Sequence, residues 1–591
     1  MSRSFYRPRP EQLFEDLDAA AYFHAPSGCY YEMRRLDGEL VFRRYQHDGD
    51  GKPINVFQVE VDWILGSGNH VRSYLYQTEL GELYQLPINW YTRTREWGMA
   101  PGFEQADHFG VRRRVRHECM FCHNAYPEVP EGSDHATGLQ LFPHELPEGT
   151  GCQRCHGPGA QHVRTALGGE PDLQVIRAAI VNPGRLDPQL RDDVCYECHM
   201  QPSVVLTSVR RFHRGIYSFR PGQPLAEYIV ALDVDLEGEE RSGRFEINHH
   251  PYRLEQSACF RESAGALSCL TCHDPHSKVP AAERAAHYRA ACAGCHELGA
   301  TAFREAHAPA LSRPAESDCT ACHMPERRTQ DVVLVTMTDH YIRRVPGGPE
   351  LLAPLEKQSD PKFVGVELLA PERGPDGVLA SVYRAVGTLR TSANTVAVEF
   401  LESSLPGTGL SEPSAWLDLV QGQLALGRLA GAEQTLQRIL SERPDHALAL
   451  ESLGLARLMA QDLDAAAEHL QRAVELNPRR PEAHYNLGLA LVEAAPEEAL
   501  VPFGEAIALR PNFADAWYYR GRMLQTLGRL DQAEAHYRRA LEIEPRQGRS
   551  YVAIATVLDE LGRRDEALRY LRHGSTAAQP PEPVQEALRR R

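Results

Sequence analysis

Six copies of one short motif, Cys-x-x-Cys-His, are the residues of this chain whose types and spacing are best suited to chemistry. They contain 12 of the 14 cysteines, and no cysteine lies beyond residue 322. Because the two thiols of a copy are three positions apart, they lie on one side of a short helical turn, where both can add to the vinyl groups of one haem. The histidine that follows is then placed under the iron as its proximal ligand. The sequence therefore predicts six covalently attached haems of the c type.

The predicted site residues form two sets. The thiols that attach haem are Cys119, Cys122, Cys152, Cys155, Cys195, Cys198, Cys269, Cys272, Cys292, Cys295, Cys319 and Cys322. The proximal iron ligands are His123, His156, His199, His273, His296 and His323. Zinc sites and disulfide frameworks also use paired cysteines, but neither requires a histidine directly after each pair. Of the two remaining cysteines, Cys29 and Cys259, we expect both to be buried and inert.

Histidines outside the motifs are candidates for the second axial position of the iron. Of the 26 histidines, 21 precede residue 346, which is more than six haems need, so most are expected to be solvated or hydrogen-bonded. Pro275 separates His276 from the motif histidine before it, so we expect it to reach an adjacent haem rather than the same iron. Four histidines with favourable local sequence complete the predicted metal ligands: His70, His162, His276 and His340. Weaker candidates are His249, His250 and His307.

Length and composition limit the fold and the partners. A chain of 591 residues is too long for one core and predicts two to four domains. A net charge of −16 argues against a nucleic-acid binder, which needs a basic face to neutralise phosphates. No run of about 18 apolar residues is present, so we expect no transmembrane segment.

The pattern along the chain predicts a multidomain α+β protein. Residues 1–110 alternate in hydrophobicity around turn signals such as Asp37-Gly38, and are expected to form antiparallel β-strands. Residues 111–345 are the predicted haem-packed region, with a further β segment at about 204–245, and residues 346–375 are a predicted linker rich in proline, glycine and charge. Residues 376–575 are expected to form an all-helical solenoid, and residues 576–591 a tail.

The helical region has an internal repeat. Prolines recur at Pro444, Pro478, Pro511 and Pro545, and glycines recur in the same phase. The clearest unit runs from Asp515-Ala516-Trp517 to Pro545 and is the tetratricopeptide (TPR) helix-turn-helix pattern. Four units are predicted at 414–447, 448–480, 481–513 and 514–547, with a less regular fifth at 548–573 and a degenerate cap at 376–410. Such repeats commonly hold a protein or peptide partner in their groove.

The chain resembles bacterial multihaem c-type cytochromes fused to TPR repeats. Cys152-Gln-Arg-Cys155-His156-Gly-Pro-Gly is similar to a motif of the nitrifier tetrahaem cytochrome and hydroxylamine oxidoreductase lineage. The fourth and sixth motifs, in Cys272-His273-Asp-Pro-His276 and His323-Met-Pro, are similar to those of doubled-motif cytochromes. The resemblance implies mostly bis-histidine haems in close pairs that work as an electron wire.

In that family a further Cys-x-x-Cys-His precedes a segment similar to Met1-Ser-Arg-Ser-Phe5. Haem attachment takes place outside the cytoplasm, yet no export signal is present in this sequence. We therefore expect a longer natural chain with a signal peptide and a seventh haem, and a periplasmic or extracellular location.

Three functions follow as expectations. The leading one is electron transfer between redox partner proteins, with the repeats docking a partner. The second is a multihaem oxidoreductase that acts on a small nitrogen or sulfur compound at an iron with an open position; no catalytic residue is identified for it. The third is an interaction scaffold in which the haems act as redox sensors.

Overall fold

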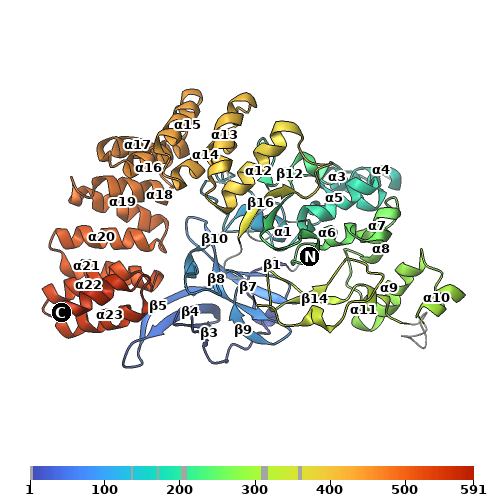
Figure 1. Cartoon of the computed structure of the whole chain (residues 1–591), viewed down its shortest axis with the longest axis horizontal. Coiled ribbons are helices and arrows are strands. Elements are labelled where there is room, and N and C mark those ends of the chain that lie inside the picture. Colours follow the sequence, from blue (N-terminus) through green and yellow to red (C-terminus); the bar gives the residue numbers. More distant parts are fainter. Residues whose placement is uncertain (1–3, 135–137, 170–171, 201–208, 308–316, 357–361) are drawn as a thin grey trace. The chain divides into compact units, whose positions relative to one another are not determined.

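The computed structural model describes residues 4–134, 138–169, 172–200, 209–307, 317–356 and 362–591, and the chain divides into two compact units (Figure 1). The repeat unit consists of Phe5–Met120, Pro127–Leu146 and Thr388–Arg591. The Cys-His unit consists of Met1–Ser4, Phe121–Tyr126 and Pro147–Gly387. Each unit is described by itself.

Two antiparallel sheets form the N-terminal part of the repeat unit, as the alternating hydrophobicity predicts. One has the order β2-β3-β4-β5, and the other has the order β1-β6-β7-β8-β10 with β9 paired to β8. The strands of the first sheet are Tyr22–His24, Cys29–Leu36, Glu39–His47 and Pro53–Glu60. Those of the second, in chain order, are β1 Phe5–Tyr6, β6 Trp63–Leu65, β7 Val71–Gln77, β8 Leu83–Tyr91, β9 Glu96–Met99 and β10 Arg113–Val115.

The hairpin between β3 and β4 shows why the sequence folds this way locally. Leu36 pairs with Glu39, so only Asp37 and Gly38 form the turn, and both have positive φ (52° and 96°). This is the two-residue turn whose twist matches that of the strands, and Asp-Gly is one of its preferred sequences. Aromatic side chains such as Phe42 and Trp90 then form the sheet core.

The C-terminal part of the repeat unit is a stack of antiparallel helix pairs, and Figure 1 shows these helices lying beside one another. The helices, in chain order, are α13 Thr395–Ser404, α14 Ser414–Ala425, α15 Leu429–Glu442, α16 Ala447–Met459, α17 Leu463–Leu476, α18 Pro481–Leu491, α19 Pro496–Leu509, α20 Ala514–Thr526, α21 Leu530–Ile543, α22 Gly548–Glu560, α23 Arg564–Ala577 and α24 Glu582–Arg589. The four predicted units and the fifth each correspond to one pair, from α14–α15 to α22–α23. The predicted tail is partly wrong, because residues 582–589 form α24 and bury Val584.

The repeated glycines are required where the two helices of a pair meet. A Cβ atom on Gly488 would lie 2.7 Å from the ring of Phe503, and one on Gly521 would lie 2.8 Å from the ring of Tyr537. Both distances are shorter than van der Waals contact allows, so only glycine lets these aromatic side chains pack against the first helix.

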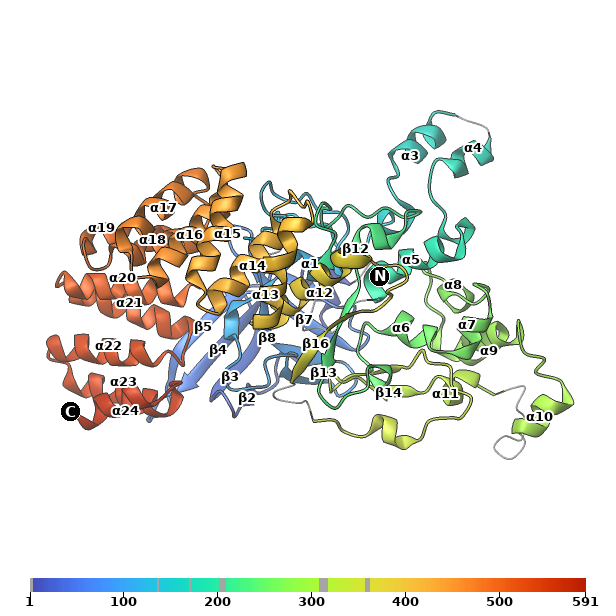
Figure 2. The same ribbon diagram turned by 45° about the horizontal axis from the view of Figure 1, so that its top comes forward.

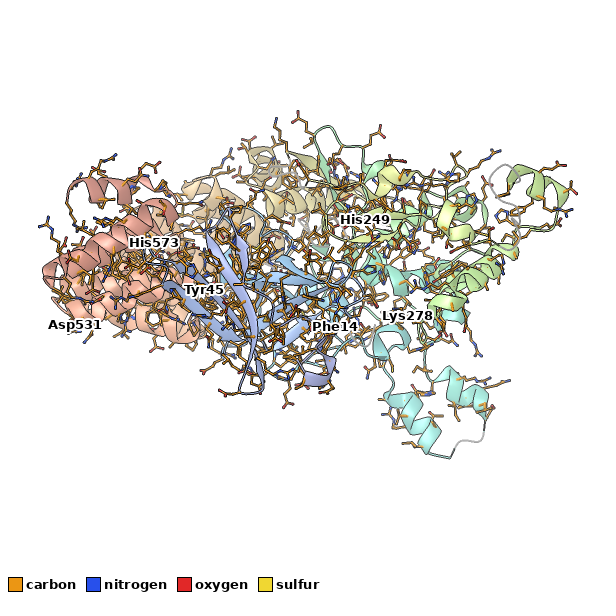
Figure 3. The ribbon with its side chains drawn as sticks, turned by 90° about the horizontal axis from the view of Figure 1, so that it is seen from below. Phe14, Tyr45, His249, Lys278, Asp531 and His573 are labelled. Carbon is orange, nitrogen blue, oxygen red and sulfur yellow. The ribbon has the colours of Figure 1, made fainter. Side chains whose placement is uncertain are left out.

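The solenoid packs directly on the sheets of its own unit. Ala514 and Ile543 belong to the same hydrophobic cluster as the sheet residues, and Arg510 forms a two-pronged ion pair with buried Glu82 at 2.7 and 2.8 Å. Figure 2 shows the end of β5 beside α21 and α22, and Figure 3 labels His573, whose Nε2 lies 3.1 Å from the Gln46 side chain of β4. Part of the solenoid surface is therefore covered by the β-sheets of the same chain.

The Cys-His unit is built from short helices and two-stranded ribbons. β13 (Leu232–Leu236) pairs with β16 (Phe363–Leu368), and Gly387 of α12 (Gly377–Thr391) lies against their side chains. Two smaller ribbons pair β11 (Val209–Arg210) with β12 (Ile229–Val230) and β14 (Glu326–Arg328) with β15 (Thr336–Thr338). The β segment predicted at 204–245 is thus limited to short strands, and its residues 204–208 lie outside the described residues. The predicted linker at 346–375 contains strand β16, because Val364, Val366 and Leu368 stand at every second position, which suits a ribbon more than a spacer.

We predict that Arg510→Met lowers the free energy of unfolding of the protein by about 3–5 kcal/mol, because the buried Glu82 carboxylate loses its two close hydrogen bonds and keeps only the half-exposed Arg114, 3.6 Å away. Urea denaturation followed by tryptophan fluorescence measures this. The control is Arg529→Met, which removes an exposed pair with Glu497 and should change the value by less than about 1 kcal/mol. Equal effects of the two variants would contradict the role given to Arg510.

Candidate functional site

All six motifs lie on helical turns, as their spacing predicts. They are found on α1 (His117–His123), α2 (Gln153–His156), the end of α5 (Pro188–His199), α8 (Cys269–Cys272), the end of α9 (Arg284–Ala293) and α11 (Cys319–His323). In the second motif the backbone N–H of His156 donates to the carbonyl of Cys152 at 2.9 Å, and the same bond joins His273 to Cys269 at 3.0 Å. One turn of helix therefore holds two thiols and one imidazole of the same motif together.

Four motif histidines lie opposite a histidine from elsewhere in the Cys-His unit. The ring centroids are 5.9 Å apart for His156–His276, 5.7 Å for His199–His250, 6.1 Å for His273–His340 and 5.9 Å for His323–His307. One metal ion between two imidazoles, about 2 Å from each nitrogen, separates the centroids by about 6 Å. The sequence analysis favours His276 and His340 for this position, and the structure brings His250 and His307 to it as well.

Backbone hydrogen bonds fix the proton on several of these rings. Nδ1 lies near a main-chain carbonyl oxygen in His156 (Val181, 2.8 Å), His323 (Arg343, 2.6 Å), His307 (Phe303, 2.8 Å) and His340 (Thr338, 3.1 Å). A carbonyl oxygen only accepts, so each Nδ1 carries the proton. Nε2 then keeps a free lone pair, which is the arrangement of a histidine that binds a metal.

Burial keeps the inner histidines neutral. It lowers the pKa of His340 from its usual 6.5 to about 4 and holds the pKa of His250 well below its usual value, with the neighbouring imidazoles adding to the effect. Burial also lowers the pKa of His199 and His273. Only the neutral imidazole binds a metal, so these sites offer the required form at neutral pH.

Several predicted residues have other surroundings. His162 lies on α3 (Ala160–Leu167) and its Nδ1 donates to the Ile176 carbonyl at 2.9 Å; within the described residues no motif ring stacks with it. His70 is exposed in the repeat unit, between β6 and β7. The ring of His249, labelled in Figure 3, packs on Tyr252. In the part of the Cys-His unit that the structure describes, neither His123 nor His296 has a second histidine opposite its ring.

The two cysteines outside the motifs differ from each other. Cys29 is buried in β3, which confirms the expectation for it. Cys259 is exposed on α7 (Ala258–Glu262), so the expectation that it is buried was wrong. The whole of α7 is similar in this respect, since none of its residues is buried.

Seven short helices of the Cys-His unit bury none of their residues, unlike α5 and α12, and this bears on whether a haem would fit there. No residue is buried in α3, α4 (Leu173–Ala178), α7, α8, α9, α10 (Thr301–His307) or α11. By contrast, each helix from α14 to α23 buries three or more residues. In Figures 2 and 3, α3 and α4 project away from the rest of their unit. Flat apolar groups held between these helices would supply the filling that the side chains do not.

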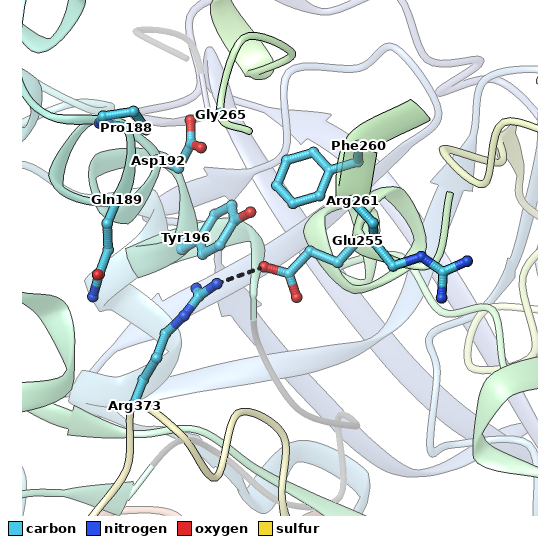
Figure 4. A pocket seen from close by; sticks show the side chains of 9 residues that line it. All are labelled: Pro188, Gln189, Asp192, Tyr196, Glu255, Phe260, Arg261, Gly265 and Arg373. Carbon is cyan, nitrogen blue, oxygen red and sulfur yellow. Dashed lines mark hydrogen bonds and ion pairs between the residues drawn. The ribbon is translucent and has the colours of Figure 1, made fainter. Parts of the chain in front are cut away.

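A cavity of about 420 Å³ adjoins the third motif (Figure 4). Asp192 and Tyr196 of α5 line it beside Cys195, and Glu255 and Arg373 form an ion pair at 3.3 Å across it. Phe260 supplies a second aromatic wall. The aromatic walls suit a flat group, and the polar lining has carboxylates (Asp192, Glu255) as well as arginines (Arg261, Arg373).

A buried ion pair connects the segments that carry two of the second histidines. Arg253, three residues after His250, donates two hydrogen bonds of 2.9 Å to Asp339, which precedes His340. Asp339 is fully buried, and burial alone would raise its pKa, but the hydrogen bonds from Arg253 and Arg343 lower it below the usual value. The pair therefore holds His250 and His340 in place, and their rings stack at 4.4 Å.

Neither a metal-ion cluster nor a membrane-spanning helix is found among the described residues. No group of three or more histidine, cysteine, aspartate or glutamate side chains is placed there to hold a metal ion. No described helix combines the length and the apolar character needed to cross a membrane.

Comparison with known proteins identifies the class of the solenoid. Residues 514–547 match the tetratricopeptide repeat family, and residues 454–494 match a TPR repeat family. No curated protein matches the chain significantly. The C-terminal part of this protein is thus a TPR solenoid, in one unit with antiparallel sheets.

Several solved structures match a part of this chain. MamA protein is 28% identical, over 27% of this chain and 89% of MamA, with a TM-score of 0.26. YrrB, described as a TPR protein with an unusual peptide-binding site, is 17% identical over 34% of this chain and all of its own, with a TM-score of 0.29. A thermophilic TPR protein of Thermus thermophilus is 27% identical over 30% of this chain and 96% of its own, with a TM-score of 0.26.

We predict that Asp339→Asn lowers the free energy of unfolding by about 3–5 kcal/mol, since buried Arg253 loses its countercharge. Chemical denaturation followed by near-ultraviolet circular dichroism measures the change. Asp274→Asn, which alters an exposed carboxylate near His276, is the matched control and should leave unfolding unchanged. A stable Asp339→Asn variant would show that the pair does not hold this region together.

Proposed function

We propose that this protein is a six-haem c-type cytochrome that transfers electrons between redox partner proteins, and that its TPR solenoid docks a partner. The observation that supports this most is the set of four histidine pairs at 5.7–6.1 Å, each containing one motif histidine. Two imidazoles at that spacing suit the two axial positions of a low-spin iron, and Nε2 is free in His156, His307, His323 and His340.

Each part of the Cys-His unit has a role in this proposal. The paired thiols hold the haem edge covalently, the motif imidazole binds the iron from one side, and the second histidine binds it from the other. Haem iron supplies one-electron redox chemistry, and its potential depends on ligand, burial and nearby charge. His199–His250 and His273–His340 are joined by the 4.4 Å ring contact of His250 and His340, so these two sites are close neighbours.

The solenoid leaves part of its surface for a partner in this proposal. Its contacts with the sheets involve segments near Arg510, Ile543 and His573. The pairs α14–α15 and α16–α17 make their main contacts with other helices of the solenoid. A protein or peptide partner would therefore bind toward the N-terminal repeats. Because haem attachment takes place outside the cytoplasm, the location that goes with this function is periplasmic or extracellular.

A second candidate is an oxidoreductase that acts on a small nitrogen or sulfur compound. The observation that favours it is that His123 and His296 have no second histidine opposite them among the described residues. An iron with one open position binds small ligands. A high-spin ferric signal that changes on addition of nitrite or hydroxylamine would support this candidate.

Intact mass after expression with haem maturation machinery in the bacterial periplasm tests the haem assignment. Six haems add about 616 Da each, and the reduced protein should show the sharp α-band of low-spin c-type haem. Colourless protein of unmodified mass, or zinc in place of iron, would contradict the proposal. His276→Met should change the axial ligand and the spectrum of one haem, whereas His162→Met should leave the spectrum unchanged. A spectrum unaffected by both would contradict the assigned pair His156–His276.

A further inference from the structure

Residues at the same position of the first three motifs lie in contact with one another. Phe121, Arg154 and Glu197 each occupy the second place between the two cysteines of their motif, in Cys119-Met-Phe-Cys122, Cys152-Gln-Arg-Cys155 and Cys195-Tyr-Glu-Cys198. Arg154 and Glu197 form an ion pair at 3.1 Å with side chains that are only 1% and 2% exposed. Nη2 of Arg154 also donates to the Phe121 carbonyl at 2.8 Å, and the guanidinium lies 4.0 Å from the Phe121 ring centre.

The third motif is the centre of this arrangement. Nη2 of Arg154 lies 4.0 Å from Sγ of Cys198, and Sγ of Cys122 lies 3.8 Å from the Cys198 carbonyl oxygen. The attachment thiol Cys122 of the first motif and the Arg154 guanidinium of the second motif therefore both lie close to Cys198 of the third. Haems fixed at these thiols would be neighbours, and the third would border both of the others.

The charge at this position is not explained by folding stability alone. A buried ion pair is often no more stabilising than apolar side chains of the same size, because both charges lose their hydration. Nε and Nη1 of Arg154 have no hydrogen-bond partner within the described residues, although they are buried. Two buried N–H groups without acceptors lower the stability of the folded state, so stability alone does not account for an arginine here. The arginine does place a fixed positive charge among three attachment turns.

We propose that the Arg154–Glu197 ion pair positions the first three haem-attachment turns around the third and sets the reduction potentials of the haems held there. This inference rests on the proposed function. Arg154 and Glu197 are positioning residues, since they act on the irons through charge and packing and are not ligands. A nearby positive charge favours the less positive, reduced iron, and a negative charge favours the oxidised iron.

The two charges predict opposite effects. Arg154→Gln removes the positive charge and should lower the midpoint potential of at least one haem. Burial raises the pKa of Glu197, so this carboxyl group binds a proton more readily once Arg154 is gone, and the lower potential is expected from the lost guanidinium. Glu197→Gln leaves the Arg154 guanidinium and should raise the midpoint potential. The double variant has no net change in charge and should return toward the wild-type potentials. Arg154→Lys cannot reproduce the same fork of hydrogen bonds, but it keeps the positive charge. It should therefore preserve the potentials better than Arg154→Gln.

Spectroelectrochemical titration of the full-length holoprotein measures the midpoints, and intact mass of each variant gives its haem count. Arg480→Gln, which breaks the buried Arg480–Glu451 pair of the solenoid, is the control and should leave all midpoints unchanged. Shifts of the same sign in the two single variants, or none in any variant with six haems, would overturn this inference while leaving the cytochrome assignment intact. Absence of haem from the wild type would instead refute the proposed function. If Arg154→Gln does not fold, Glu197→Gln and the double variant still decide the outcome.

Discussion

Many short helices of the Cys-His unit have no apolar surface of their own chain to pack against, and its other features follow from this constraint. Seven of its described helices bury no residue, yet histidine rings, ion pairs and cysteine thiols are held inside it at defined spacing. Secondary structure alone does not stabilise helices of four to ten residues, which need a surface to pack against. In the proposed protein that surface is the porphyrin, so that folding and cofactor attachment of this unit become one process.

Buried ion pairs hold segments of the Cys-His unit together where few apolar side chains are in contact. Arg253 with Asp339, and Arg244 with Asp233 at 2.9 Å, are buried pairs, and the first connects segments that are 86 positions apart in sequence. Such pairs are directional, since a guanidinium fork fits a carboxylate in few orientations. They therefore fix the orientation of the loops that carry histidines, which a nonspecific apolar contact would not do.

How much could be predicted from the sequence depended on whether the signal was local. The β-hairpin at Asp37-Gly38 and the solenoid pairs follow from two-residue turn chemistry and from a repeat of about 34 residues, and both were predicted with close boundaries. The helical turn of each motif is equally local. The second histidines are different, because His307 lies near His323 while His156 meets His276 from 120 positions away, and only the fold brings these rings together. His250 was ranked low because its partner His199 is 51 positions away and nothing in the intervening sequence marks the pair.

Attachment of the solenoid to the sheets has a consequence for how the repeats open. A free repeat array frays from both ends, because each terminal pair has only one neighbour. Here the C-terminal pairs are anchored through Arg510, Ile543 and Tyr551, whose hydroxyl accepts from Asn55 of β5 at 2.7 Å. Local unfolding is thereby disfavoured at the C-terminal end of the array. The last repeats can open only together with their contacts to the strands, so their stability is coupled to that of the sheets.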